Sequence, residues 1–343
     1  MDTGSLTKKR AKSMFFMVKL TTFATQKPGS MQITQIKSIM VAQHPLVIDG
    51  GLGSELAARG HDVSSPLWSA QLILSQPDAI VEAHRAYLDA GARCIISASY
   101  QASIPGLEAA GYDTSEIRAV FTDAVALARR ARAEYLRDNP DCDYYPLVAA
   151  SVGPYGAYLA DGSEYRGNYG VDDAALRDFH RQRLQWLDNS GADLLACETI
   201  PDLQEARVLA QLLTGTSTPG WVCFCCRDDE HLHDGNRLRD AVELLRDLPT
   251  VIAVGVNCCA PGLVSGLIAN LRAVAGDRPI VVYPNSGAQY DAERKCWHGQ
   301  ETSQQWARQA VAWHRAGAAI IGGCCRIGPE HIRELTQRKT WHY

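Results

Sequence analysis

Eight short runs of apolar and β-branched residues alternate with longer segments whose apolar residues recur about every 3.6 positions. The apolar runs are 46–49, 94–99, 147–152, 193–198, 221–225, 251–257, 280–283 and 319–322. Helical patterns cover 114–137, 172–190, 202–213, 236–247, 263–275, 303–316 and 329–338. Apolar strands that are each followed by a helix form a parallel sheet whose outer face the helices cover. Eight such units favour a closed (β/α)8 TIM barrel of the α/β class over an open doubly wound sheet.

The chain divides into a basic N-terminal extension and one long domain. With 343 residues, 46% of them hydrophobic, it can bury a large core. No linker interrupts residues 44–340, which we expect to form a single barrel domain. Up to Met40 there are seven Lys or Arg residues and a single acid, Asp2. This bias is typical of an organelle transit peptide, and a disordered tail or a segment upstream of a later start codon has the same composition. We expect residues 1–43 to be disordered or to serve in targeting.

Charge, hydropathy and cysteine usage exclude several classes of protein. The formal net charge of −4 argues against a dedicated nucleic-acid surface. No apolar run is long enough to cross a bilayer, so we expect no membrane association. The eleven cysteines lie in a long chain without a convincing signal peptide. This favours reduced thiols inside the cell over disulfides. We expect a cytoplasmic protein, or an organellar one if the basic leader directs it there, and the sequence does not specify its oligomeric state.

Three cysteines stand at the ends of two predicted strands. Cys258 closes the run Val-Ile-Ala-Val-Gly-Val-Asn-Cys, and Cys324 and Cys325 close Ala-Ala-Ile-Ile-Gly-Gly-Cys-Cys. The carboxyl ends of the strands in a parallel barrel meet on one face, so these sulfur atoms can meet there. Three thiolates with an open fourth position describe a zinc site that can hold a substrate.

The alternatives to metal binding are a buried apolar thiol and a redox-active disulfide. Neighbouring residues in a strand point to opposite faces, so Cys324 and Cys325 need an irregular backbone if both are to face the site. We expect Gly322 and Gly323 to supply that freedom. Cys259 could compete as a ligand because it follows Cys258 directly.

One connection is longer than a joint between a strand and a helix requires. Residues 153–170 follow the third predicted strand, and strand-to-helix loops usually have about 2–6 residues. The loop leaves the strand on the same face as the cysteines. Long loops of this kind often act as lids or binding loops. The tyrosines that it carries are Tyr155, Tyr158, Tyr165 and Tyr169.

Four motifs resemble the zinc-dependent homocysteine S-methyltransferases. They are Asp-Gly-Gly-Leu-Gly-Ser-Glu-Leu (49–56), Cys-Glu-Thr-Ile-Pro (197–201), Gly-Val-Asn-Cys (255–258) and Gly-Gly-Cys-Cys-Arg-Ile-Gly-Pro-Glu-His-Ile (322–332). The similarity extends in order from about residue 46 to residue 335. The tyrosine-rich loop and Val-Tyr-Pro-Asn-Ser-Gly (282–287) are similar to the branch that uses S-methylmethionine as methyl donor.

The resemblance implies specific roles for residues at the strand ends. The zinc ligands of the family fall on Cys258, Cys324 and Cys325. Asp49 and Glu198 are implied to bind the ammonium group of homocysteine. The backbone near Gly50 and Gly51 and the hydroxyl of Ser97 are implied to bind its carboxylate. The sequence departs from the family at three places: Cys259 replaces the usual threonine, and Cys223 and Cys225 replace common serines.

The activity implied is methyl transfer from S-methylmethionine, with S-adenosylmethionine as a further donor, to the thiolate of zinc-bound homocysteine, which forms methionine. Aromatic rings in a dry pocket can bind a sulfonium cation, so we expect Tyr155 and Tyr158, together with Tyr165, Tyr169 or Trp297, to bind the donor. The alternative for these rings is that they only pack the loop.

Two alternatives to the implied activity stay open. One is methyl transfer to selenocysteine, and the other is a non-catalytic barrel that binds zinc or thiols. For the acids, Asp49 could instead cap the helix that starts near Ser54. Glu198 closes an apolar strand, where a carboxylate is costly without a partner, and this favours a functional role for it.

Overall fold

The computed structural model describes residues 33–42, 45–65, 67, 69–287, 289–291, 296–298 and 301–338. In this part of the chain, one eight-stranded parallel sheet has the order β1-β10-β7-β6-β5-β4-β3-β2. Its strands are β1 (Leu46–Val47), β2 (Cys94–Ile96), β3 (Leu147–Val152), β4 (Leu194–Ile200), β5 (Gly220–Phe224), β6 (Val251–Asn257), β7 (Ile280–Tyr283) and β10 (Ala318–Ile321). A parallel bridge between Ile48 and Cys94 joins the two ends of the sheet. The predicted (β/α)8 barrel is confirmed, and each predicted strand overlaps one of these eight.

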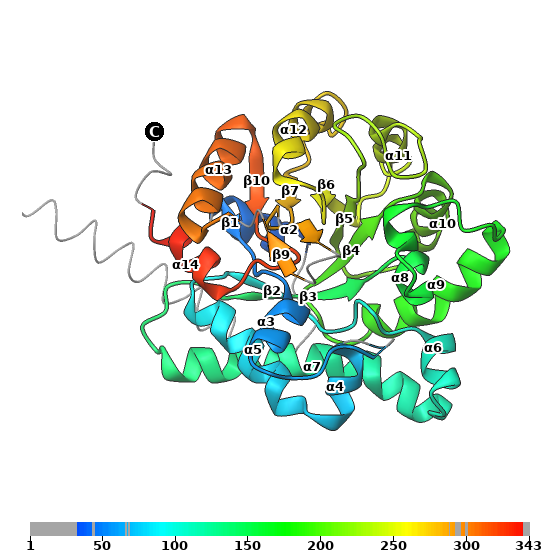
Figure 1. Ribbon diagram of the computed structural model, residues 1–343, viewed down its shortest axis with the longest axis horizontal. Helices are drawn as coiled ribbons and strands as arrows, with labels where there is room; N and C mark the ends of the chain where they lie inside the picture. The colour runs from blue at the N-terminus through cyan, green and yellow to red at the C-terminus, as the bar shows by residue number, and fades with distance from the viewer. Residues whose placement is uncertain are drawn as a thin grey trace, which may run out of the picture.

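Helices surround the barrel (Figure 1). The principal ones are α5 (Pro77–Asp89), α7 (Thr114–Asp138), α9 (Asp173–Asp188), α10 (Leu203–Leu213), α11 (Leu238–Glu243), α12 (Val264–Arg272), α13 (Ser303–Ala316) and α14 (Pro329–Thr336). The loops add the short helices α3 (Leu52–Ala58), α4 (Ser69–Ser75), α6 (Ile104–Ala109) and α8 (Tyr155–Leu159), and the antiparallel pair β8 (Gln289–Asp291) and β9 (Cys296–His298). Among the described helices, none combines the length and the apolar character that a membrane span requires.

Carboxylate caps set the starts of several long helices. Asp113 accepts hydrogen bonds from the backbone N–H groups of Ser115 and Glu116 at the start of α7, and Glu116 completes a capping box. Asp202 does the same at the start of α10 for Gln204 and Glu205. Such caps satisfy amide groups that have no partner inside the helix. The cap of α10 also fixes Glu205, which anchors the long loop after β3.

The strands divide their side chains between two cores. Leu147 and Ala149 belong to the cluster inside the barrel, while Val148 and Ala150 belong to the larger cluster between the sheet and the helices. This alternation follows from the two-residue period of a strand. All four side chains are fully buried. The barrel interior is therefore packed with side chains, and a cavity lined by residues at the carboxyl ends of the strands lies beyond it.

A helix precedes the first strand within the expected N-terminal extension. It is α2 (Ile33–Ala42), and its Ile36 is fully buried in the cluster inside the barrel. Only residues 43–45 separate α2 from the start of β1, so the helix lies at the amino end of the barrel, opposite the strand ends that carry the cysteines. Residues 33–42 thus pack with the domain, while residues 1–32 lie outside the described part of the chain.

We expect Ile36→Ala to lower the free energy of unfolding by about 2–5 kcal/mol, because it removes a fully buried side chain from the barrel interior. Lys37→Ala, at an exposed position of the same helix, is the control and should change stability by less than about 0.5 kcal/mol. Urea unfolding followed by circular dichroism measures both. Equal stability of the two variants would show that α2 does not contribute to the barrel core.

Candidate metal centre and active site

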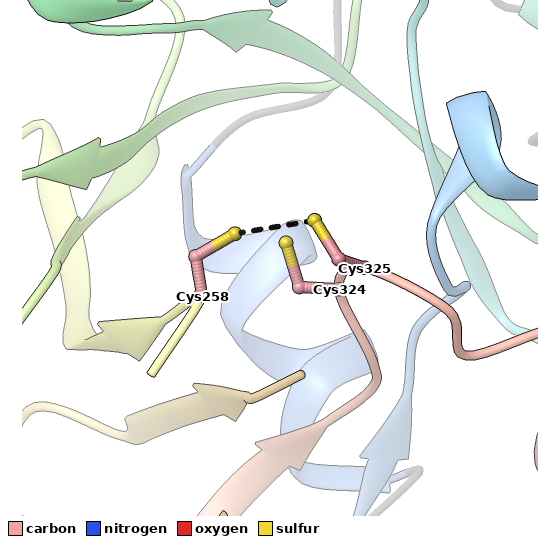
Figure 2. A group of neighbouring side chains, drawn as sticks. All are labelled: Cys258, Cys324 and Cys325. Carbon is pink, nitrogen blue, oxygen red and sulfur yellow. Dashed lines mark hydrogen bonds between the residues drawn. The ribbon is translucent and has the colours of Figure 1, made fainter. Parts of the chain in front are cut away.

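The three predicted ligand cysteines meet at one point. Cys258 follows β6, and Cys324 and Cys325 follow β10. Figure 2 shows the three side chains pointing toward one another from these two loops. All three Sγ atoms lie within 4.8 Å of one another, and those of Cys258 and Cys325 are 3.9 Å apart. No other group of three His, Cys, Asp or Glu side chains in the described residues is so arranged.

The loop after β7 holds the two cysteine loops together, because β7 lies between β6 and β10 in the sheet. Asn285 in this loop bonds to both sides: its Oδ1 accepts from Cys325 N at 3.1 Å, and its Nδ2 donates to Cys258 O at 3.0 Å. Cys324 N also donates to Pro284 O at 2.9 Å. The spacing of the sulfur atoms therefore depends on an asparagine outside the cysteine motifs.

The glycines before Cys324 serve a different purpose from the one expected. Neither Gly322 nor Gly323 has a positive φ, so conformational freedom is not what the site uses. A Cβ on Gly322 would overlap Ile48, and one on Gly323 would overlap Ile327. The glycines allow the β10 loop to lie directly against its neighbours. The strained backbone is instead at Cys258, a non-glycine residue with φ of +53°.

The chemistry of the three thiols fits a divalent soft metal ion. Hydrogen bonds from Cys258 and Cys324 hold the pKa of the Cys325 thiol well below its usual value. The pKa of Cys324 is raised by its hydrogen bonds to Cys258 and Cys325. The group on its own thus favours one thiolate among the three sulfurs. A divalent cation would offset the charge of all three, and thiolate ligands favour zinc among such ions.

The sulfur atoms open onto a cavity of about 290 Å³. The cavity lies beyond the carboxyl ends of the strands, where ligands of barrel enzymes bind. Of the residues predicted to contact homocysteine, four line the cavity and Asp49 does not. Those four are Gly50, Gly51, Ser97 and Glu198.

Asp49 is buried behind the cavity wall at the end of β1. Its Oδ2 accepts a hydrogen bond from Ile96 N at 2.8 Å. Its Oδ1 is buried and has no hydrogen-bond partner among the described residues. Burial raises the pKa of the Asp49 carboxyl well above its usual value, and the charge of Glu198 raises it further. The helix-capping alternative is not what the structure has, because Gly51 is the N-cap of α3 and no side chain caps it.

Glu198 is directed into the cavity by an irregularity in β4. The pairing of β4 with β5 shifts register between Cys197 and Ile200, and Thr199 has a φ of +61°. Asn257 stabilises this bulge, since its Oδ1 accepts from Thr199 N at 2.7 Å and its Nδ2 donates to Thr199 Oγ1 at 2.8 Å. Bulges of this kind often re-aim side chains beside active sites.

The Glu198 carboxyl is poised to change protonation near neutral pH. It accepts a hydrogen bond from Ser151 Oγ, and a hydrogen bond from Tyr283 also lowers its pKa. Burial outweighs these and raises the pKa of Glu198 to about 7. A buried carboxylate with such a pKa gains from binding a cation.

Ser97 and the glycines form the wall between the two acids. Ser97 Oγ accepts from Ser151 N at 3.1 Å and lies 2.8 Å from Ser99 Oγ. Gly51 N donates to Ile327 O at 3.0 Å, so this amide is already engaged. A Cβ on Gly51 would overlap Cys324 O, so glycine lets the β1 loop touch the cysteine loop.

The tyrosines of the long loop separate into two groups. The rings of Tyr155 and Tyr158 pack against each other and against Phe179 of α9, with Tyr155 also touching Tyr169. None of these three tyrosines lines the cavity, whereas Tyr165 does, and its hydroxyl lies 3.7 Å from Cys258 Sγ. The loop-packing alternative describes the positions of Tyr155 and Tyr158. The side chain of Trp297 lies outside the described residues.

Glu205 of α10 anchors this loop through hydrogen bonds. Its Oε1 accepts from Tyr155 N at 2.5 Å and lies 2.8 Å from His180 Nε2, and its Oε2 accepts from Tyr169 OH at 2.8 Å. Arg183 donates to Gly153 O at the start of the loop. Buried, hydrogen-bonded polar groups of this kind hold a loop in one conformation.

The other cysteines near the strand ends are not part of the three-cysteine group. Cys259 belongs to the outer core cluster and Cys223 to the cluster inside the barrel. Cys225 Sγ contacts Cys258 O at 3.6 Å, a backbone atom. None of them joins the group that could hold a metal.

Several cavity residues were not identified from the sequence. They include Tyr100, Gln101, Glu164, Thr199, Asn257 and Tyr283. Asn257 and Tyr283 end β6 and β7, so their positions at the strand ends could have identified them as cavity residues. Tyr100 and Glu164 lie in loops, where no periodicity indicates which side chains face inward.

The fold and the site define a parallel (β/α)8 barrel with a three-cysteine group that could hold a metal ion. A sequence profile of the homocysteine S-methyltransferase family matches residues 46–339. The chain is 46% identical over 309 residues to the homocysteine S-methyltransferase of Escherichia coli (strain K12), which covers 90% of this chain and 99% of that protein. It is 42% identical over 305 residues to the selenocysteine Se-methyltransferase of Brassica oleracea var. italica, covering 85% and 88% of the two chains.

A solved structure with a similar sequence also has a similar fold. The metallated form of the homocysteine methyltransferase MmuM from Escherichia coli superimposes with a TM-score of 0.79 at 43% identity, covering 89% of this chain and 99% of that one. The chain belongs to the homocysteine S-methyltransferase family.

We expect Asn285→Ala to weaken metal binding at least tenfold, because it removes both side-chain hydrogen bonds by which the loop after β7 holds Cys258 and Cys325. Asn189→Ala is the matched control, since Asn189 Nδ2 donates to a backbone carbonyl, Gln185 O, at the distant end of α9. Competition for zinc with a chromophoric chelator measures both affinities. Equal zinc affinity in the two variants would contradict the role given to Asn285.

Proposed function

We propose that this protein transfers a methyl group from S-methylmethionine to the thiolate of homocysteine, forming methionine, with Zn²⁺ held by Cys258, Cys324 and Cys325. Membership of the family supports the reaction class. The observation that carries the proposal is that the three sulfurs open onto the same cavity as the buried carboxylate of Glu198. A cavity with a thiophilic end and an anionic end suits an amino acid that has a thiol and an ammonium group.

A free thiol with a pKa near 8.5 is only a few per cent ionised at pH 7. Zn²⁺ bound by the three cysteines would keep the homocysteine sulfur deprotonated at neutral pH. This effect is worth about 2 kcal/mol at roughly 1.4 kcal/mol per decade, so most of the rate enhancement must come from positioning.

The two acids provide that positioning for homocysteine. Glu198 faces the cavity, and Asp49 lies behind its wall with an oxygen that has no partner among the described residues. The charge of Glu198 raises the pKa of Asp49, so the two carboxyls are close enough to repel when both are ionised. The ammonium group of homocysteine relieves this repulsion. The backbone near Gly50 and Gly51 and the hydroxyl of Ser97 line the same cavity and are assigned to its carboxylate, although the Gly51 amide would have to release Ile327 O to take part.

Aromatic and loop residues hold the donor on the opposite side. The ring of Tyr165 reaches the cysteine group, where the methyl group must pass between two sulfur atoms. A direct contact of Tyr155 and Tyr158 with the donor remains a prediction. Their packing against Phe179 gives them a second way to serve it, by fixing the loop that carries Tyr165.

The activity test uses reduced, zinc-loaded protein and homocysteine, with S-methylmethionine and S-adenosylmethionine as alternative donors. We expect methionine from S-methylmethionine, detected by mass spectrometry with a labelled methyl group. Cys258→Ala should lose both zinc and turnover, while Cys142→Ala, a half-buried thiol outside the cavity, should retain both. Zinc bound without turnover would favour the non-catalytic barrel instead. Retention of both zinc and turnover by Cys258→Ala would refute its role as ligand.

Selenocysteine is the second candidate acceptor, since a selenocysteine Se-methyltransferase is 42% identical to this chain. Selenocysteine is one methylene shorter than homocysteine. If the acids fix the ammonium group, the two acceptors cannot both place their chalcogen atom at the same point. The same assay with selenocysteine therefore ranks the two acceptors by kcat/KM, and we expect homocysteine to be preferred.

The KM for homocysteine should rise as the pH falls below about 7. The pKa of Glu198 is raised to about 7, so above that pH its carboxylate is available for the ammonium group and below it is neutral. Glu198→Gln should raise the KM by about 10- to 100-fold at pH 8 and remove this part of the pH dependence. The homocysteine thiol titrates equally in both proteins, so the ratio of the two KM values isolates Glu198. A ratio that does not change with pH would contradict the assignment.

A further inference from the structure

Glu164 places a second carboxylate in the wall of the cavity, in addition to that of Glu198. It lies in the short 3-10 helix Ser163–Tyr165 of the long loop after β3. Its Oε2 is buried and has no hydrogen-bond partner among the described residues. Burial raises the pKa of this carboxyl, and the charges of Asp161 and Cys325 raise it further. Such an oxygen is costly to bury unless a ligand satisfies it.

The charge of Arg166, two residues further on, lowers the pKa of the Glu164 carboxyl, but the hydrogen bonds of this arginine are made elsewhere. Its Nη2 donates to Asp161 Oδ2 at 2.9 Å and to Ser163 Oγ at 2.8 Å. No lysine, arginine or histidine is among the described residues that line the cavity. Among the described residues, therefore, no side-chain cation is available to Glu164 inside the cavity, and a bound ligand could supply one.

The position of Glu164 is fixed by the loop around it. Gly156 of α8 lies so close to this helix that a Cβ there would be 2.5 Å from Glu164 N. Tyr155 N, one residue earlier, donates to Glu205 Oε1. The carboxylate is therefore held by anchored backbone and does not depend on a mobile segment.

Glu164 belongs to a different part of the fold from the two acids assigned to homocysteine. Asp49 and Glu198 come from the ends of β1 and β4, whereas Glu164 comes from the loop that covers the strand ends. The charge of Cys325 raises the pKa of both Glu164 and Glu198, so both carboxyls lie near the cysteine group. A cavity with carboxyl groups from two parts of the fold beside a sulfur centre suits two amino acids, each with an ammonium group, between which a methyl group is transferred.

The reaction itself indicates which cation of the donor a carboxylate should bind. The bond between the methyl carbon and the sulfonium sulfur breaks, its electron pair stays on that sulfur, and the homocysteine thiolate forms the new bond. The positive charge on the sulfonium sulfur therefore decreases in the transition state and is gone in the product, while the charge of the α-ammonium group persists. A carboxylate at the sulfonium would stabilise the bound donor more than the transition state, which slows the reaction, whereas one at the ammonium stabilises both equally.

We propose that Glu164 binds the α-ammonium group of the methyl donor and so selects amino-acid sulfonium compounds over sulfonium compounds without an amine. This inference rests on the proposed function of the site. It makes Glu164 a specificity-determining residue on the donor side. Asp49 and Glu198 then have the equivalent task for the acceptor.

The test compares Glu164→Gln with wild type on two donors, S-methylmethionine and its analogue without the amine, 4-dimethylsulfoniobutanoate. We expect the variant to lose about 10- to 100-fold in kcat/KM for S-methylmethionine and less than about threefold for the analogue. Its KM for homocysteine and its zinc content should equal those of wild type. Asp161→Asn is the matched control, because it removes a carboxylate from the same loop outside the cavity wall.

An equal loss on both donors, or no loss on either, would overturn the role of Glu164. Failure of the proposed function has a different signature, namely no methionine from wild type with any donor. In that case, calorimetric titration of zinc-loaded wild type and Glu164→Gln with S-methylmethionine still decides the inference. Weaker binding by the variant supports it, and equal binding or no binding by wild type contradicts it.

Discussion

The hydrogen bonds of Asn285 are the interaction on which the rest of the site depends. The three cysteines come from two strands that do not touch, and the loop after β7 fills the space between them. Asn285 bonds to the backbone at Cys258 on one side and at Cys325 on the other. Zinc sites commonly depend on such outer contacts to orient their ligands. These contacts allow the three sulfur atoms to lie close enough together to share one metal ion, although both loops are irregular.

The functional residues are held in states that lower the stability of the fold. The pKa of Glu198 is raised from an ordinary 4.5 to about 7. Because the pKa of this carboxyl is higher in the folded than in the unfolded protein, the free energy of unfolding falls as the pH rises from 4.5 to 7. Above pH 7 the total decrease is about 3 kcal/mol. Thr199 and Cys258 add left-handed backbone at the ends of β4 and β6. These are the costs of aiming a charge and a thiol into one cavity, and the ammonium group that we propose binds Glu198 would offset the first.

The sequence predicts the barrel and the position of the cysteines because the topology of a closed parallel barrel brings strand ends together. It does not predict which loop tyrosines face the cavity, since a loop has no side-chain period. Tyr155 packs on Phe179 while Tyr165 faces the cysteines because Glu205, on a later helix, anchors the loop. The packing of α2 could not be predicted for a similar reason. Ile36 is buried among residues that come from strands all around the barrel, and no pattern in the neighbouring sequence indicates this.

The central claim is that the three cysteines hold one zinc ion and leave a position for the sulfur of homocysteine. X-ray absorption at the zinc edge, on reduced and zinc-loaded protein, tests it directly. The account predicts three sulfur neighbours at about 2.3 Å and one lighter neighbour, which changes to four sulfur neighbours when homocysteine is added. Coordination that is unchanged by homocysteine, or that consists mainly of nitrogen and oxygen, would contradict it.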